Sequence, residues 1–165
     1  MRVLLFAFGK LKVPGVREGA DYYSKLLGGY LKFEETELKA LSVPDKSVAT
    51  RKLVQQKEGE LLLEKLTARL SPRSPFYLLD ETGKSLSTTA WATQVREWES
   101  GGTPEIALCI GSSLGFSAEI RSRARGAFSL GPQTLPHELA RVVLLEQLYR
   151  AWSVTKNHPY HNEGR

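Results

Sequence analysis

The chain has 165 residues, a formal net charge of +5 and a single cysteine. That length is sufficient for one domain with a sizeable core, and a single cysteine excludes a disulfide framework. No apolar run approaches the roughly twenty residues of a membrane span, and the first residues do not form a signal-peptide pattern. We therefore expect a single domain over residues 1–165, without a membrane segment and located in the cytoplasm.

Short apolar runs of strand type alternate along the chain with segments of helical periodicity. In chain order we expect strand 1–8, helix 15–27, strand 32–38, helix 47–70, strand 76–79, helix 87–98, strand 105–110, helix 117–125, strand 127–130 and a closing helix after residue 135. The apolar ridge expected on the long second helix consists of Leu53, Leu61, Leu62, Leu66 and Leu70. This alternation predicts an α/β fold with a mostly parallel sheet and helices on both faces.

The closing helix and the tail after it are the most distinctive part of the sequence. The apolar residues that recur there at helical spacing are Leu139, Val142, Val143, Leu145, Leu148, Tyr149 and Trp152. This phasing predicts that Arg141 and Arg150 face away from the apolar side. So much apolar surface suits either a subunit interface or a central core helix. The tail 156–161 has no apolar periodicity but contains a lysine, two histidines and a tyrosine, which indicates a functional segment.

Positive charge is concentrated toward the C-terminus. Residues 1–120 contain 16 basic and 15 acidic side chains, whereas residues 121–165 contain 7 and 3. A basic end with aromatic residues suits a polyanion such as RNA, and a solvated surface is the alternative. The same two interpretations, contact with RNA phosphates or a solvated helix face, apply to Arg121, Arg123 and Arg125.

Three of the expected strands are followed by small or turn-forming residues, in segments 79–83, 110–115 and 129–136. Ligands of open α/β sheets bind beyond the carboxyl ends of the strands, so these segments are the expected binding site. The sequence contains no Walker-type phosphate loop, no dinucleotide fingerprint and no nucleophile elbow. We therefore expect a cofactor without phosphates, and we disfavour nucleotide hydrolysis and an α/β hydrolase.

The thiol and the tail imidazoles are not expected to form a metal site. Cys109 lies in an apolar run typical of a buried strand, so we expect it in the core. His158 and His161 stand three residues apart, but no nearby cysteine or carboxylate in phase completes a zinc ligand set. We expect no bound metal.

Several motifs resemble those of one known family. They are Thr134-Leu135-Pro136-His137, Arg141-Val142, the run 146–152 and Asn157-His158-Pro159-Tyr160-His161, supported by 79–84, 57–60 and Gly9-Lys10-Leu11-Lys12. Over essentially its whole length the chain resembles the small bacterial SPOUT-type methyltransferases, which methylate N3 of a pseudouridine in 23S ribosomal RNA (rRNA) of the large subunit. The resemblance implies a C-terminal trefoil knot, a homodimer and S-adenosylmethionine as the cofactor.

The resemblance also implies where the cofactor binds. Carried over by position, the cofactor contacts are Leu79, Gly111, Leu130, Gly131, Pro132, Gln133, Thr134 and Leu135. The partner subunit would complete the cleft. Where the family has a second glycine, this chain has Ser112, which fits only if that position needs no positive φ.

Methyl transfer from a sulfonium requires an in-line arrangement and departure of the N3 proton. The candidates to orient the base or assist that proton are His137, Arg150, Tyr160 and His161. For His137 a local capping role at the helix start is the alternative. For the whole chain the alternative is a non-catalytic RNA-binding or ribosome-associated dimer, which would not bind S-adenosylmethionine.

Overall fold

The computed structural model describes residues 1–160 and contains a five-stranded sheet of order β2-β1-β4-β3-β5 with every neighbouring pair parallel. The strands are β1 (Arg2–Phe8), β2 (Lys32–Leu38), β3 (Phe76–Ser85), β4 (Glu105–Ile110) and β5 (Gly126–Ser129). The helices are α1 (Pro14–Leu27), α2 (Val48–Arg69), α3 (Thr88–Ser100), α4 (Ala118–Arg123) and α5 (His137–Thr155). This order confirms the α/β fold expected from the sequence. Of the helices in the described part of the chain, none is long and apolar enough to cross a membrane.

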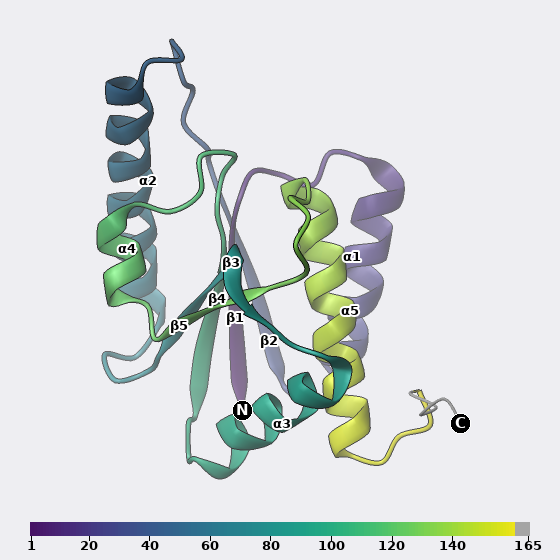
Figure 1. Ribbon diagram of the computed structural model, residues 1–165. Helices are drawn as coiled ribbons and strands as arrows, with labels where there is room; N and C mark the ends of the chain where they lie inside the picture. Colours follow the sequence, from purple (N-terminus) through teal and green to yellow (C-terminus); the bar gives the residue numbers. More distant parts are fainter. Residues whose placement is uncertain (161–165) are drawn as a thin grey trace.

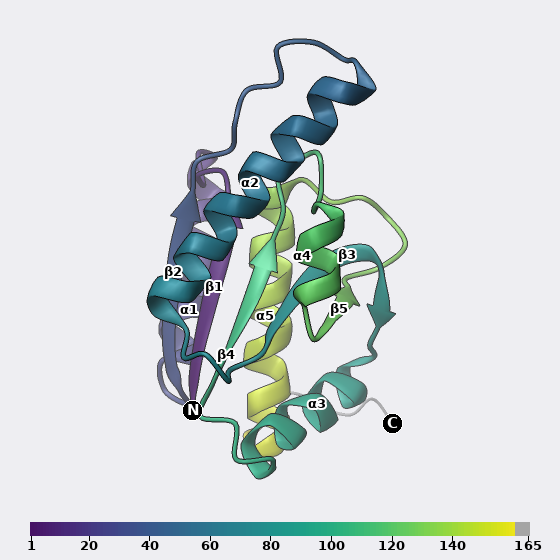
Figure 2. The ribbon, with the colours of Figure 1, turned by 90° about the vertical axis from the view of Figure 1, so that its left-hand side faces the viewer.

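The central strands β1 and β4 are buried on both faces of the sheet. Alternate residues of β1 enter different cores: Val3 and Leu5 pack with α1, α3 and α5, whereas Leu4 and Phe6 pack with α2 and α4. These two helical layers are visible in Figures 1 and 2. Burial on both faces explains why the strands are continuous apolar runs in the sequence. Cys109 of β4 is fully buried as expected, and burial raises the pKa of its thiol.

Strand β3 is longer than expected, so the prediction that it ends at Leu79 is wrong. Its pairing with β5 is interrupted after Leu79 and resumes at Lys84 with a shifted register. The expected loop 79–83 is therefore a bulge inside the strand. Gly83 permits the close crossing of the two strands, because a Cβ at this position would lie 2.7 Å from the backbone of Ala127.

The buried side of α2 differs from the expected one at its beginning. The helix starts after Ser47, whose hydroxyl accepts a hydrogen bond from the N–H of Thr50 at 3.1 Å. Its buried stripe contains Val54 and Leu62, whereas Leu53 is 51% exposed. The prediction that Leu53 belongs to the apolar ridge is wrong, because neighbouring helix positions differ in direction by about 100°.

Helix α5 packs against both α1 and α3, which leaves little of its circumference for solvent. Arg141 is fully buried, so the prediction that it faces away from the apolar side is wrong. Its guanidinium donates to Glu37 at 2.8 Å and to the carbonyl of Gly9 at 2.7 Å, and it forms an ion pair with Glu35 at 2.9 Å. Burial raises the pKa of Glu35. Burial acts on Glu37 in the same direction, but hydrogen bonds from the Leu11 N–H and from Arg141 outweigh it and lower that pKa.

Candidate active site

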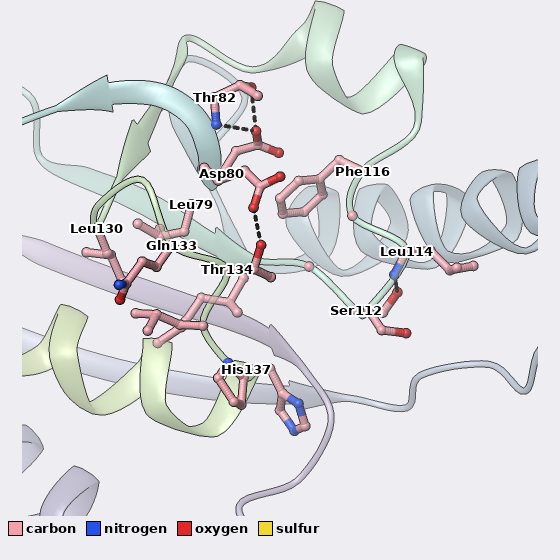
Figure 3. A pocket seen from close by; sticks show the side chains of 18 of the residues that line it. Leu79, Asp80, Thr82, Ser112, Leu114, Phe116, Leu130, Gln133, Thr134 and His137 are labelled. Carbon is pink, nitrogen blue, oxygen red and sulfur yellow. Dashed lines mark hydrogen bonds between the residues drawn. The ribbon is translucent and has the colours of Figure 1, made fainter.

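A pocket of about 630 Å³ opens at the carboxyl edge of the sheet. It lies between the β3 bulge, the connection 110–116 and the connection 130–137, which are the three segments expected from the sequence (Figure 3). Its volume lies within the range of about 300–1,000 Å³ found for small-molecule sites. The expected cofactor residues that line it are Leu79, Gly111, Leu130, Gly131, Gln133, Thr134 and Leu135, whereas Pro132 does not line it.

The β3 side of the pocket carries an ionised carboxylate. Asp80 accepts hydrogen bonds from the N–H and the hydroxyl of Thr82 and from Arg121 at 2.7 Å. Burial works to raise the pKa of Asp80, but the hydrogen bonds from Arg121 and Thr82 lower it overall. Arg121 is thus held by an ion pair, and Arg123 pairs with Glu119. Two of the three arginines considered for RNA contact are therefore bound to carboxylates of their own chain.

The connection after β4 is fixed to α2 by the buried Glu58. Ser112 donates its hydroxyl to one carboxylate oxygen of Glu58 at 2.6 Å and accepts the N–H of Leu114 at 3.2 Å. The other oxygen of Glu58 accepts the N–H of Leu41 at 2.9 Å. Within residues 110–116 the positive φ belongs to Gly115, at +70°, and not to Ser112. The serine therefore occupies the position of the family's second glycine without backbone strain.

The connection between β5 and α5 leaves open space beside a glycine. Gly131 has a φ of +138°, and no atom beyond its chain neighbours lies within 4 Å of the position that a Cβ would take. The Ser129 hydroxyl accepts the Gly131 N–H at 3.1 Å and donates to the Gly131 carbonyl at 2.7 Å, which fixes the turn. The hydroxyl of Thr134 donates to the carboxylate of Glu81, so this connection is tied to the β3 bulge (Figure 3). A ligand can therefore approach the backbone at Gly131 closely.

His137 is the first residue of α5 and lines the pocket. Its ring lies against the backbone of Gly9, where an added Cβ would be 2.5 Å from Nε2. Nε2 is buried and has no hydrogen-bond partner among residues 1–160. The helix start has no side-chain cap, so the capping alternative for His137 is wrong. Glu138 instead accepts the backbone N–H groups of Lys12 and Val13.

Arg150 and Tyr160 do not line the pocket. Arg150 is 13 residues beyond His137 on the same helix, which corresponds to about 20 Å. Arg150 and Tyr160 both hydrogen-bond Glu146, and the guanidinium lies 4.9 Å from the centre of the Tyr160 ring. Burial and the hydroxyl of Tyr23 raise the pKa of Tyr160, so its phenol stays protonated near neutral pH. These side chains form a separate cluster on the side of α1 and α5.

The described part of the tail folds back onto α1, α5 and the turn after α1. Nδ1 of His158 lies 2.8 Å from the hydroxyl of Tyr30, which is on the turn after α1. His161, the remaining candidate for base orientation, lies outside the described residues, and its role stays a prediction. Within residues 1–160 no three histidine, cysteine, aspartate or glutamate side chains come together in a metal-binding group.

The pocket lies at the carboxyl edge of an open, all-parallel sheet and is built from three chain segments. This arrangement defines the class of α/β proteins that bind a small ligand at that edge. A family described as "Predicted SPOUT methyltransferase" matches residues 1–161, and the chain belongs to this family.

Curated relatives match over nearly the full length. The "Ribosomal RNA large subunit methyltransferase H" of Exiguobacterium sibiricum is 35% identical over 98% of this chain and 99% of the relative. The protein of the same name from Trichlorobacter lovleyi is 36% identical over 98% of this chain and 100% of the relative. The protein of the same name from Maridesulfovibrio salexigens is 38% identical over 93% of this chain and 94% of the relative.

Proposed function

We propose that the chain is an S-adenosylmethionine-dependent methyltransferase of the cytoplasm. In this proposal it methylates N3 of a pseudouridine in 23S rRNA, within the assembled large subunit or the whole ribosome. The observation that carries the proposal is that the three segments assigned to the cofactor surround one pocket. The names of the relatives support rRNA as the substrate. The trefoil knot stays a prediction of the family resemblance.

The volume and the lining of the pocket are consistent with S-adenosylmethionine. Open space beside Gly131 lets an uncharged heterocycle such as adenine lie against the backbone of the connection between β5 and α5. On the β3 side of the pocket the charge of Asp80 is balanced by Arg121, and Glu81 adds a further negative charge, which suits a cofactor with a sulfonium cation. The residues that would hold the cofactor are the lining residues of segments 79–82, 110–116 and 130–135. When bound, S-adenosylmethionine supplies the methyl group.

The chain itself must hold the target nitrogen in line and accept its proton. Of the three candidates within residues 1–160, His137 is the one that lines the pocket. We assign to His137 the orientation of the base or the acceptance of the N3 proton. Because Nε2 now lies buried against Gly9, this role requires the ring to turn toward the incoming base.

Arg150 and Tyr160 do not line the pocket of their own chain. In the proposed homodimer these two residues and His161 would reach the pocket of the partner subunit. Exposed large apolar side chains on or beside α1, α5 and the tail support an interface there: Val13, Tyr22, Leu139 and Tyr160. Leu144 and Leu148 are fully used by the core of their own subunit, so only the outer side of α5 remains for a partner. The interpretation as a core helix therefore holds for the inner side of α5.

The direct test is methyl transfer from tritiated S-adenosylmethionine to large subunits and whole ribosomes that lack this modification. We expect one methyl group per 23S rRNA, located by nuclease digestion and mass spectrometry at N3 of a pseudouridine. A folded protein that binds ribosomes without binding S-adenosylmethionine would instead establish the non-catalytic alternative. Transfer to another nucleotide would refute the N3-pseudouridine assignment alone.

A further inference from the structure

A basic, exposed segment lies on the side of the pocket opposite to α1 and α5. It comprises residues 39–57, the connection after β2 and the first turns of α2, and is here named the α2 arm. Its ionisable side chains are Lys39, Asp45, Lys46, Arg51, Lys52 and Lys57. Every residue from 39 to 49 is exposed. Figures 1 and 2 show the arm standing above the carboxyl edge of the sheet.

The cations of the α2 arm are available to an outside partner. Across the described residues, none of its five basic side chains pairs with a carboxylate. Asp45 caps the start of α2, accepting the N–H of Ser47 at 2.7 Å and the hydroxyl of Thr50 at 2.9 Å. The C-terminal cations differ, since Arg141 is buried among carboxylates and Lys156 is bound to a glutamate. Within residues 1–160, folding therefore leaves more unpaired positive charge on the arm than on the segment from residue 121 onward.

Apolar side chains are interspersed with these cations. Val48 is 83% exposed and Leu53 is 51% exposed, and Leu41 and Val43 are also exposed. Such a group of exposed apolar residues on a soluble protein is typical of a contact surface. Unpaired cations combined with apolar contacts suit single-stranded or looped RNA, where phosphates meet cations and riboses and unstacked bases meet apolar atoms.

The α2 arm is joined directly to the pocket wall. The side chain of Gln55 donates to the carbonyl of Leu114, and one turn later Glu58 holds Ser112. Val48 precedes Gln55 by seven residues, which places it about 10 Å from this contact along the helix. A polymer bound along the arm would therefore pass beside the pocket opening.

We propose that the α2 arm is an RNA-binding surface that holds rRNA beside the pocket. In this arrangement Arg51 and Lys52 bind phosphates, and Val48 and Leu53 pack on exposed riboses and bases. The inference rests on the proposed function, because that function makes rRNA the substrate. The inference goes beyond that function by naming the residues that hold the RNA. Neither the pocket nor the family match identifies them.

The test is co-sedimentation with purified large subunits and whole ribosomes over a series of KCl concentrations, because the proposed function places the rRNA in these particles. The double variant R51A/K52A should bind about tenfold more weakly, and its slope of log K against log salt should be smaller by about 1.5, as expected for two lost phosphate contacts. V48S should bind several-fold more weakly with an unchanged slope, because it removes no charge. Both variants alter exposed positions and should titrate with S-adenosylmethionine as the parent does.

The matched control is R73A/R125A, which removes two exposed cations at the opposite, amino edge of the sheet. It should change RNA affinity by less than about twofold, because the inference places the RNA at the carboxyl edge. For Arg125 this corresponds to the solvated alternative considered from the sequence. Equal losses in both double variants, or no loss in R51A/K52A, would overturn the inference. A change in self-association instead of RNA affinity, seen by sedimentation, would also overturn it and identify a second copy of the chain as the occupant.

The outcomes for the two proposals are separable. A parent protein that binds RNA through the arm but not S-adenosylmethionine would support the arm and refute the methyltransferase. A parent that binds S-adenosylmethionine but no RNA would overturn the arm and leave the cofactor pocket intact.

Discussion

The cations of the C-terminal segment and those of the α2 arm differ in what folding does to them. In the sequence, the excess of basic residues is in the last 45 residues, and residues 1–120 are nearly balanced. In the structure, Arg141 is buried, Arg150 is bound to Glu146 and Lys156 is bound to Glu99, whereas the arm keeps its cations exposed and unpaired across the described residues. Charge available to a polyanion is therefore set by pairing within the fold more than by the local count.

The largest effect that tests this comparison is expected for Arg141→Met. Removing the guanidinium leaves Glu35 and Glu37 without their buried partner, so the free energy of unfolding should fall by about 3–5 kcal/mol. Urea unfolding followed by circular dichroism measures it. The control Arg51→Met removes an exposed cation of the arm and should stay within about 0.5 kcal/mol of the parent. Equal stability of the two variants would contradict the distinction between the two regions.

The next effect concerns the link between the α2 arm and the pocket. The two carboxylate oxygens of Glu58 accept hydrogen bonds from Ser112 and Leu41, and Glu58→Gln removes one of these acceptors. The free energy of unfolding should therefore fall by about 1–3 kcal/mol. The affinity for S-adenosylmethionine should also fall several-fold, measured by calorimetry, because the connection 110–116 loses its anchor. The control is Glu60→Gln, on the exposed side of the same helix. An unchanged cofactor affinity in Glu58→Gln would show that the link is structural only.

For substitutions in the tail we expect a smaller effect on stability, together with a loss of activity. Tyr160→Phe removes the hydrogen bonds to Glu146 and Tyr23 and should change the free energy of unfolding by no more than about 1 kcal/mol. If the tail acts at the partner's pocket, kcat should fall by about tenfold with unchanged cofactor affinity, a loss of about 1.4 kcal/mol. His161→Ala should act in the same way. Tyr22→Phe is the control, and unchanged methylation in both tail variants would remove the tail from the mechanism.

The smallest expected effect is a pH dependence with opposite signs at the two carboxylates of Arg141. The raised pKa of Glu35 means that its stabilising contribution is complete below pH 4.5 and is lost as the pH rises through the folded-state pKa. The lowered pKa of Glu37 means the reverse: its contribution is present above pH 4.5 and is lost as the pH falls. Relative to the parent, Glu35→Gln should therefore gain stability from acid to neutral pH, and Glu37→Gln should lose it. Urea unfolding across that range would contradict this account if the two variants changed in the same direction.

Local patterns in the sequence were sufficient to predict the order of the elements and the position of the pocket. Strands buried on both faces give continuous apolar runs, and the turn residues after them mark the carboxyl edge where the pocket lies. The extent of β3 could not be predicted in this way, because its second half depends on the register with β5. That register is a contact between residues far apart in the chain, and no local signal reports it.

The polar contacts of the site were the least predictable part. Glu58 and Ser112 are 54 residues apart, so the local sequence around one gives no indication of its contact with the other. The periodicity of α5 predicted that Arg141 faces away from the apolar side. It indicates a single apolar face, whereas the helix is covered on two sides. A basic residue within an apolar helix, with two glutamates at alternate positions of β2, is the signal from which this buried cluster could have been suspected.

The account depends most directly on the pocket as the site of a methyl donor. Calorimetric titration of the purified chain with S-adenosylmethionine, and then with S-adenosylhomocysteine, tests this without requiring the RNA substrate. The account predicts micromolar binding of both at one site per subunit, weakened in Glu58→Gln and unchanged in Glu60→Gln. A folded protein that binds neither ligand would contradict it and favour the non-catalytic RNA-binding alternative.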